Sequence, residues 1–276
     1  MLDYTGYSQK GFTDDEMAKL YQNPSENPCE LLTNEYLVVK NADGDIVDYL
    51  RWDGEKLVKT SVKPFRSKRG EKLIKARNPQ QIMAVDMLLN PNITIKALHG
   101  RFGSGKDFLM INAALSLIES GNYERLCWVR NNIEVKNTTA LGALPGNAFE
   151  KLSPFLMPFA DHVGGILGVE FMVRDKIIEV EHLGFIRGRD FKNTIIYCSE
   201  AENITKEHCQ LLIGRVGEGS ALWINGDCKQ TDKDVFEKSS GLLTAIDKLK
   251  GHPLFGFVHL EKSERSATAA LADLLD

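Results

Sequence analysis

The stretch Gly100-Arg101-Phe102-Gly103-Ser104-Gly105-Lys106-Asp107 decides the fold of this chain. It matches the phosphate-binding loop (P-loop) signature, in which two glycines frame four residues and are followed by Lys and then by Ser or Thr. Only the last position departs from the signature, because Asp107 stands where a hydroxyl is expected. That hydroxyl ordinarily binds Mg²⁺, so the stretch predicts a nucleoside triphosphate site in which the place of the metal ion is altered.

The segments on either side of this loop have the character that a P-loop requires. Residues 93–98 are typical of a buried strand, and residues 108–119 are typical of an apolar helix that ends at Ser120-Gly121-Asn122. In this order, backbone amides and a helix N-terminus favour phosphate, and Lys106 can reach the β and γ phosphates. The alternative is a glycine-rich turn that contains a lysine by chance, which the flanking strand and helix disfavour.

Composition and charge narrow the class of protein. With 276 residues, 43% of them hydrophobic and 26% charged, the chain is long and apolar enough for one large and one small globular domain. The net charge of −4 means that any contact with nucleic acid needs a local basic surface. Five cysteines form no CxxC pair, which indicates reduced thiols and a cytoplasmic protein. We expect no membrane segment, because no apolar run is long enough to span a bilayer.

Four regions follow one another along the chain. Residues 1–30 are polar and rich in turns, and they predict a peripheral segment with one helix. Residues 31–62 hold short apolar runs separated by Asp43-Gly44 and Asp53-Gly54, which predicts a small antiparallel β module. Residues 63–77 are basic, either as a solvated linker or as a strip that contacts nucleic-acid phosphates. Residues 78–276 form the predicted P-loop domain.

That domain alternates strands and helices. Beyond the P-loop strand, the expected strands are residues 126–129, 177–180, 194–198, 221–224 and 255–258. Such alternation predicts an α/β fold with a mostly parallel, doubly wound sheet. Ligands of these sheets lie beyond the carboxyl ends of the strands. We therefore expect the P-loop, Ser199-Glu200 and Gly226-Asp227 to meet at one crevice, with Gly226 allowing a tight turn.

The strand at residues 194–198 resembles a Walker B element, which ends in Asp-Glu. The Asp of that pair holds Mg²⁺, and the Glu orients or deprotonates the attacking water. Here Ser199 stands in place of the Asp, and Glu200 is retained. A strand that ends in a solvated polar turn is the simpler alternative.

Taken together, these residues resemble the PhoH-like family, whose nucleotide-binding core looks like that of superfamily-one helicases. The resemblance begins near Leu31, and we expect no PIN nuclease domain. It rests on segments spread along the chain, namely residues 77–81, 141–146 with 150–152, 186–189, 200–203, 215–220 and Gly226-Asp227 with Gln230. It implies binding and hydrolysis of ATP with Mg²⁺, coupling to single-stranded RNA, and a homo-oligomer for which a hexameric ring is one candidate.

The resemblance also implies roles for single residues. The nucleotide would contact Gln81, which reads adenine, and residues 100–108, including Arg101, Phe102, Ser104 and Phe108. Asp227 and Gln230 would sense the γ phosphate, and Arg265 would place a positive charge against it, with Arg215 as the rival for that place. The residues expected along a nucleic-acid path are Arg130, Arg187 and Arg189. A solvated polar or ion-paired residue is the alternative at each of these positions.

The two departures from the family pattern concern the same metal ion. The P-loop has a carboxylate at Asp107 where it should have a hydroxyl, and the Walker B strand has the hydroxyl of Ser199 where it should have a carboxylate. We hypothesise that the two positions exchanged their Mg²⁺ ligands, and we expect Asp107, Ser199 and Glu200 at the metal site. The competing hypothesis is a nucleotide-binding regulatory protein with impaired hydrolysis. A small-molecule kinase, a third possibility, would not explain the segment from Gly226 to Gln230.

Overall fold

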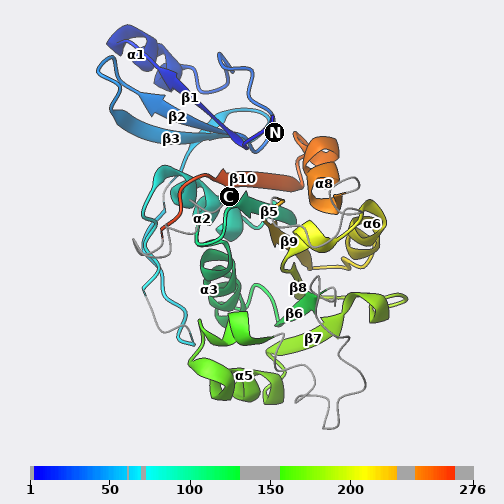
Figure 1. The fold of residues 1–276 in the computed structure, drawn as a ribbon. Helices are drawn as coiled ribbons and strands as arrows, with labels where there is room; N and C mark the ends of the chain where they lie inside the picture. Colours follow the sequence, from blue (N-terminus) through cyan, green and yellow to red (C-terminus); the bar gives the residue numbers. More distant parts are fainter. Residues whose placement is uncertain (1–2, 61, 70–72, 131–155, 229–239, 265–276) are drawn as a thin grey trace, which may run out of the picture.

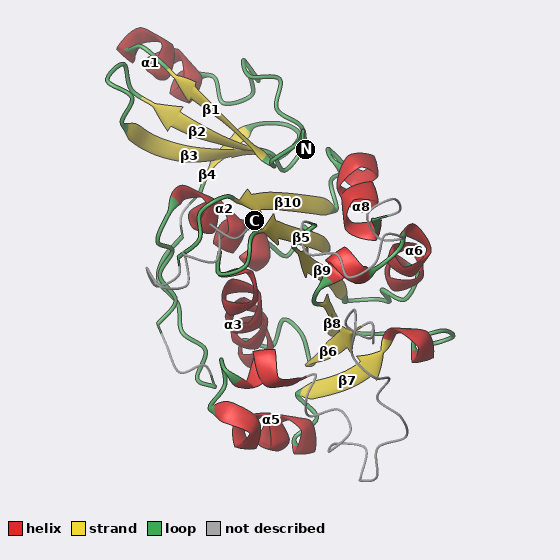
Figure 2. Ribbon diagram, in the orientation of Figure 1, coloured by secondary structure: helices red, strands yellow, loops and turns green. Residues whose placement is uncertain are grey.

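The computed structural model describes residues 3–60, 62–69, 73–130, 156–228 and 240–264. A large α/β domain carries a smaller β domain at one end (Figure 1; Figure 2). The elements in chain order are β1 (Tyr7–Gly11), α1 (Asp14–Gln22), β2 (Tyr36–Lys40), β3 (Ile46–Trp52), β4 (Leu57–Lys59), α2 (Pro79–Leu89), β5 (Ile95–Gly100), α3 (Lys106–Glu119), β6 (Arg125–Arg130), α5 (Gly165–Arg174), β7 (Ile178–His182), η1 (Leu183–Phe185), β8 (Thr194–Cys198), η2 (Ala201–Asn203), α6 (Lys206–Ile213), β9 (Ala221–Gly226), α8 (Gly241–Leu249) and β10 (Phe255–Leu260). No helix in these described ranges is long and apolar enough to cross a membrane.

The large sheet has six strands in the order β10-β5-β9-β8-β6-β7, and every neighbouring pair is parallel. This confirms the α/β fold and the parallel sheet predicted from the sequence. The strand that leads into the P-loop, β5, lies between β10 and β9. The loop therefore begins one strand in from the outer strand β10.

Successive side chains along a strand point to opposite faces of the sheet. They therefore pack into two separate hydrophobic cores, one on each face. Leu98, Trp128 and Tyr197 point to the face covered by α2, α3 and α5. Their neighbours Ala97, Cys127 and Ile196 belong to the cluster that packs against α6 and α8. Helices on both faces make the sheet doubly wound (Figure 1).

The small domain is a four-stranded sheet in the order β1-β2-β3-β4. The β2-β3 and β3-β4 pairs are antiparallel, as expected, but β1 pairs with β2 in parallel, so the sheet is mixed. Strand β1 and helix α1 come from residues 1–30, and Phe12 and Leu20 share a core with Leu37 and Leu50. This first segment is thus part of the same small domain.

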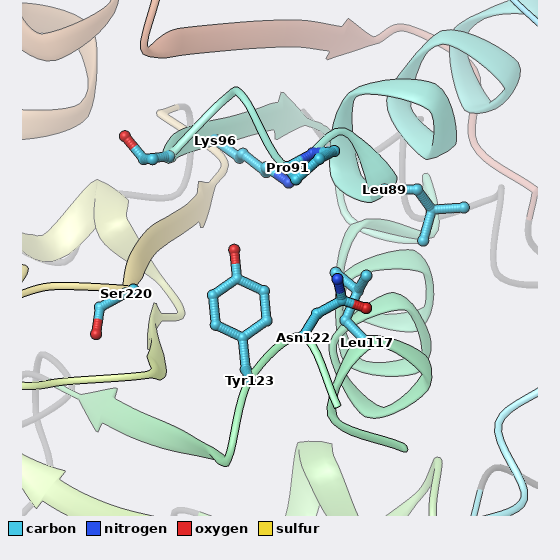
Figure 3. Close-up of a pocket in the computed structure, with 9 residues that line it drawn as sticks. Leu89, Pro91, Lys96, Leu117, Asn122, Tyr123 and Ser220 are labelled. Carbon is cyan, nitrogen blue, oxygen red and sulfur yellow. The ribbon is translucent and has the colours of Figure 1, made fainter. Parts of the chain in front are cut away.

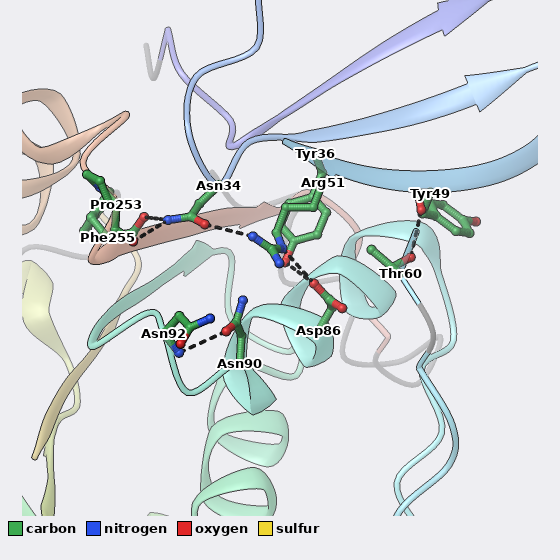
Figure 4. A network of polar contacts seen from close by, with 10 residues as sticks. All are labelled: Asn34, Tyr36, Tyr49, Arg51, Thr60, Asp86, Asn90, Asn92, Pro253 and Phe255. Carbon is green, nitrogen blue, oxygen red and sulfur yellow. Dashed lines mark hydrogen bonds and ion pairs between the residues drawn. The ribbon is translucent and has the colours of Figure 1, made fainter. Parts of the chain in front are cut away.

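Polar contacts fasten the small domain to the large one (Figure 4). The Asp86 carboxylate on α2 accepts a hydrogen bond from the Tyr36 hydroxyl at 2.8 Å and pairs with Arg51 at 3.4 Å. The Asn34 amide donates to the backbone oxygens of Pro253 and Phe255, both at 2.9 Å. The small sheet is therefore tied to helix α2 and to the edge strand β10.

The basic segment between the domains runs alongside α3. Glu119, at the end of α3, accepts hydrogen bonds from the backbone amides of Lys68 and Arg69 and from the Ser67 hydroxyl. It also forms an ion pair with the Arg69 guanidinium at 3.6 Å. Part of this segment is thus anchored to the domain, which a freely solvated linker would not be.

Candidate nucleotide-binding site

Three predicted motifs lie at the carboxyl ends of adjacent parallel strands. The P-loop follows β5, Asp227 follows β9, and Ser199-Glu200 follows β8. These strands are consecutive in the sheet. The structure therefore brings these three segments together at one edge, as the sequence predicted for a doubly wound sheet.

Glycines shape the P-loop in two different ways. Gly103 and Gly105 have φ angles of +80° and +91°, in the left-handed region that favours glycine. At Gly100, by contrast, a side chain would come 2.5 Å from the backbone oxygen of Leu260 on β10. The Lys106 ammonium folds back over the loop and donates to the backbone oxygens of Gly100 and Arg101, at 2.5 and 3.1 Å. It thus stands at the loop that phosphate would occupy.

Gln81, the expected adenine reader, is buried against the P-loop. Asn78 caps helix α2, and its side-chain oxygen accepts a hydrogen bond from the backbone N–H of Gln81. The Gln81 side chain donates to the backbone oxygen of Ser104 at 3.1 Å and accepts from the backbone N–H of Arg77 at 3.0 Å. The residue is thus adjacent to the loop, and its contact with adenine stays a prediction.

Asp107 is turned toward the sheet. Its Oδ1 atom accepts hydrogen bonds from the Tyr197 hydroxyl at 2.6 Å and from the Asn225 amide at 2.8 Å. The same Asn225 amide also donates to the Tyr197 hydroxyl at 2.7 Å. Burial, and secondarily the Asp107 charge, raise the pKa of Tyr197 well above its usual value, so the phenol remains a donor. Neither partner could be recognised from the sequence, since they lie 90 and 118 residues away from Asp107.

The residues of the proposed metal exchange have the chemistry to hold Mg²⁺. The Ser199 hydroxyl is buried and has no hydrogen-bond partner among the residues that the structure describes. Both hydrogen bonds to Asp107 fall on Oδ1, so Oδ2 takes no part in them. Within the described ranges no three acidic, His or Cys side chains converge as a metal centre. That is compatible with Mg²⁺ bound to nucleotide, which draws most of its ligands from phosphate and water.

The arginines expected along a nucleic-acid path differ in their surroundings. Arg130 forms an ion pair with Glu200, the residue expected to act as the Walker B glutamate. Arg189 pairs with Glu179 at 2.7 Å and with Glu181, which raises the pKa of its guanidinium against the opposing effect of burial. Arg187 is exposed. Two of the three charges are therefore already balanced within the chain, which sequence spacing could not reveal.

Glu202 is a site residue that the sequence analysis did not single out. Only 6% of it is exposed, and its Oε2 atom accepts a hydrogen bond from the backbone N–H of Asp227 at 3.0 Å. Burial raises the pKa of this carboxyl to about 7. Its position after β8, two residues beyond Glu200, is the sequence feature that could have identified it as a candidate.

The reason for glycine at position 226 differs from the one expected. Gly226 is absent from the residues with positive φ, so a tight turn does not require it. A side chain there would instead meet Glu202, at 2.7 Å from Oε2 and 2.9 Å from the backbone nitrogen. Close approach between the ends of β8 and β9 therefore excludes a side chain.

Two predicted residues, Gln230 and Arg265, lie outside the described residues. The segment leading to Arg265 does contact the P-loop, because the Glu264 backbone N–H donates to Gly103 at 3.0 Å and the Asn78 amide donates to the Glu264 carboxylate at 2.8 Å. The rival Arg215 donates to the backbone oxygen of Arg189. The choice between Arg265 and Arg215 stays a prediction.

A pocket of about 250 Å³ lies at the opposite, amino-terminal edge of the sheet (Figure 3). Among the residues lining it are Tyr123, Ser220 and Lys96. Lys96 is fully buried, donates to the backbone oxygen of Leu88 at 2.5 Å and lies over the Trp223 ring at 5.1 Å. The lysine thus has structural partners, and the pocket is separate from the P-loop.

Comparison with known proteins agrees with this geometry. The family model described as PhoH-like protein matches residues 73–272. Protein PhoH2 of Bacillus subtilis is 35% identical over 212 residues, covering 73% of this chain and 48% of the relative. Protein PhoH2 of Thermobispora bispora is 28% identical over 274 residues, covering 97% of this chain and 62% of the relative. The PhoH-like protein of Bacillus subtilis is 31% identical over 168 residues, covering 60% and 52%.

The chain therefore spans about half to three fifths of the length of these relatives. The matched region includes the P-loop, the Walker B strand and the segment after β9. The family model covers well over half of the chain. The chain belongs to the PhoH-like protein family.

Proposed function

We propose that this chain binds ATP and hydrolyses it with the help of Mg²⁺. The observation that carries the proposal is the P-loop itself, set between β5 and α3 with Lys106 over its backbone and Gln81 bonded to Ser104. An exposed phosphate loop at the carboxyl edge of a parallel sheet is a binding place for a nucleotide.

Each residue then has a distinct task. Lys106 exchanges the backbone oxygens of Gly100 and Arg101 for the β and γ phosphates. Glu200 orients or deprotonates the attacking water, which requires it to leave its ion pair with Arg130. Asp227, placed by Glu202, lies beside the terminal phosphate.

Mg²⁺ would neutralise charge on the phosphates, with Asp107 and Ser199 as its ligands from the protein. The Ser199 hydroxyl supports this assignment, because it is buried and has no hydrogen-bond partner in the described part of the chain. Calorimetry with a non-hydrolysable ATP analogue, in Mg²⁺ and in EDTA, tests it. We expect binding to depend strongly on the ion, because without it Asp107 would repel the phosphates. Equal affinity in the two buffers would contradict the proposed exchange of Mg²⁺ ligands between Asp107 and Ser199.

A pair of variants tests the coupling of the two positions. Asp107→Thr and Ser199→Asp should each weaken binding of the Mg²⁺-nucleotide complex, and the double variant should recover most of the loss. A double variant no better than the worse single variant would show that the positions act independently. Affinity is the required measurement, because Asp107→Thr also alters the partner of Tyr197.

A regulatory protein that binds ATP without hydrolysing it is the second candidate. The ion pair of Glu200 with Arg130 favours it, since a paired glutamate is a poor base for water. Measurement of phosphate release separates the two candidates. Steady release with Mg²⁺ supports the ATPase, whereas tight binding without release supports the regulator.

We further propose that ATP hydrolysis is coupled to single-stranded RNA. We also propose that the protein is cytoplasmic and assembles into a homo-oligomer, for which a hexamer is one candidate. These proposals rest on membership of the family, and exposed Arg187 is available for phosphate contacts. Phosphate release with and without RNA tests the coupling, and analytical ultracentrifugation tests the assembly. Unchanged release and a monomer with bound nucleotide would contradict them.

A further inference from the structure

A pair of histidines lies directly behind the P-loop. His99 is the last residue before Gly100 on β5, and His259 is its neighbour in register on β10. Their Nδ1 atoms are 2.8 Å apart, and the two rings are stacked with centroids 4.9 Å apart. His99 is 9% exposed. Neither residue belongs to the nucleotide-binding motifs.

The pair connects three strands through one line of hydrogen bonds. On the far side of His99, the Nε2 atom accepts a hydrogen bond from the backbone N–H of Cys228 at 3.2 Å. Cys228 follows Asp227, the expected sensor of the γ phosphate. On the near side, the backbone N–H of His259 donates to Thr5 of the small domain at 2.9 Å. The line therefore runs from the small domain across β10 and β5 to the segment after β9.

The contacts define where the protons are. Because the Cys228 N–H needs a lone pair, His99 is unprotonated at Nε2, and a neutral ring then carries its proton at Nδ1. That proton is donated to Nδ1 of His259, whose own proton lies at Nε2. One proton thus lies between the two rings, and both rings are neutral.

We propose that His99 and His259 are positioning residues that hold the Asp227-Cys228 segment in register with the P-loop, and that they do so only while both rings are neutral. The geometry requires this condition. A proton added at Nε2 of His99 opposes the Cys228 N–H. A proton added at Nδ1 of His259 faces the Nδ1 proton of His99, unless the proton of His99 moves to Nε2. Each arrangement breaks either the bond between the two rings or the bond from Cys228 to His99.

The surrounding charges set the pH range. Burial is the main influence on His259 and lowers its pKa below the ordinary value, and the Lys106 ammonium acts in the same direction. The carboxylate of Glu261, after β10, a hydrogen bond to the backbone of His99, and the carboxylate of Asp227, after β9, oppose this effect. The bond to Cys228 is accordingly present at neutral pH and is lost only as the pH falls below about 6.5, the ordinary histidine value.

The first test needs no nucleotide and therefore stands apart from the proposed function. Nitrogen-15 NMR of the histidine rings should show His99 protonated at Nδ1 and His259 at Nε2 near neutral pH. Exchange of the Cys228 amide hydrogen should accelerate as these ring signals titrate toward acid. Any other pair of tautomers, or amide exchange that does not follow the ring titration, overturns the proposal.

The second test rests on the proposed ATP binding and uses matched variants of His99. Gln places an uncharged acceptor near Nε2, so His99→Gln should keep the Cys228 bond and lose its dependence on pH. His99→Leu removes the acceptor and should weaken binding of an ATP analogue about three- to tenfold at neutral pH, as expected for one hydrogen bond. Urea unfolding checks that both variants fold.

Affinity is then measured between about pH 5 and pH 8. The unmodified protein should approach the affinity of His99→Leu at the acid end, while His99→Gln stays level. Parallel profiles for all three proteins overturn the positioning role. If no protein binds nucleotide, the proposed function fails, and the NMR experiment still decides whether the histidine pair controls the Cys228 segment.

Discussion

Replacing Asp107 by Asn and by Ala separates its structural contact from its proposed part in binding Mg²⁺. In the structure, Oδ1 is the acceptor for the buried Tyr197 hydroxyl and for the Asn225 amide. An Asn side chain can present its own oxygen to both donors, whereas Ala removes the acceptor of the Tyr197 hydroxyl and leaves the Asn225 amide only its bond to Tyr197. The two variants therefore differ in stability although each removes the charge.

The expected magnitudes follow from these contacts. A hydrogen bond to a charged group contributes about 1.5–3 kcal/mol, and the Asn225 amide keeps its bond to Tyr197, so Asp107→Ala should lose about 2–4 kcal/mol of unfolding free energy. Asp107→Asn should lose about 1 kcal/mol, since neutral hydrogen bonds replace charged ones. Both variants should bind the Mg²⁺-nucleotide complex at least about tenfold more weakly, equal to about 1.4 kcal/mol.

Urea unfolding followed by tryptophan fluorescence measures stability, and calorimetry with an ATP analogue measures affinity. Asp247→Ala serves as a control, because this carboxylate is 58% exposed and pairs only with solvated lysines, so it should lose less than about 1 kcal/mol. Equal stability of the Asn and Ala variants of Asp107 would refute the role of Oδ1. Unchanged affinity in Asp107→Asn would refute its role as a metal ligand.

Three further substitutions test other parts of the fold by urea unfolding. Gly226→Ala forces its new methyl group against Glu202 and should lower the free energy of unfolding by about 1–3 kcal/mol. As a control, Gly11→Ala should leave stability unchanged, because the nearest atom to the new methyl group is 3.8 Å away. Equal effects of the two substitutions would contradict the close packing at Gly226. Burial lowers the pKa of Lys96 to about 7, so above pH 7 the folded state binds fewer protons than the unfolded state. The free energy of unfolding, relative to that of Lys96→Met, should therefore rise by up to about 1.4 kcal/mol per pH unit from pH 7 toward pH 10. Parallel curves of stability against pH for the two proteins would show that Lys96 titrates normally. Asp86→Ala removes the partner of Arg51 and Tyr36 between the domains and should cost about 2–4 kcal/mol, and a loss below about 1 kcal/mol would mean that the network contributes little.

Much of the fold could be predicted because its signals are local. The strands at residues 194–198 and 221–224 are continuous apolar runs, as buried parallel strands usually are, and both occur in the structure. Strand β1 was missed because Ser8-Gln9-Lys10 is polar and largely exposed. It is a strand because it pairs with β2, whose first residue, Tyr36, is the partner of Tyr7 and lies 29 residues after it. No short window of sequence contains that partner.

By itself the sequence determined that a P-loop follows a buried strand, that the domain is a parallel α/β sheet, and that Asp107 and Ser199 depart from the family pattern at the positions proposed to bind Mg²⁺. Only the tertiary structure decided what these residues contact. Tyr197 and Asn225 hold Asp107, Arg130 pairs with Glu200, and Glu202 approaches the backbone of Asp227. The reason is physical: strand and helix periodicity depend on neighbours in sequence, whereas hydrogen bonds and burial at the sheet edge depend on strands that the chain brings together from distant positions.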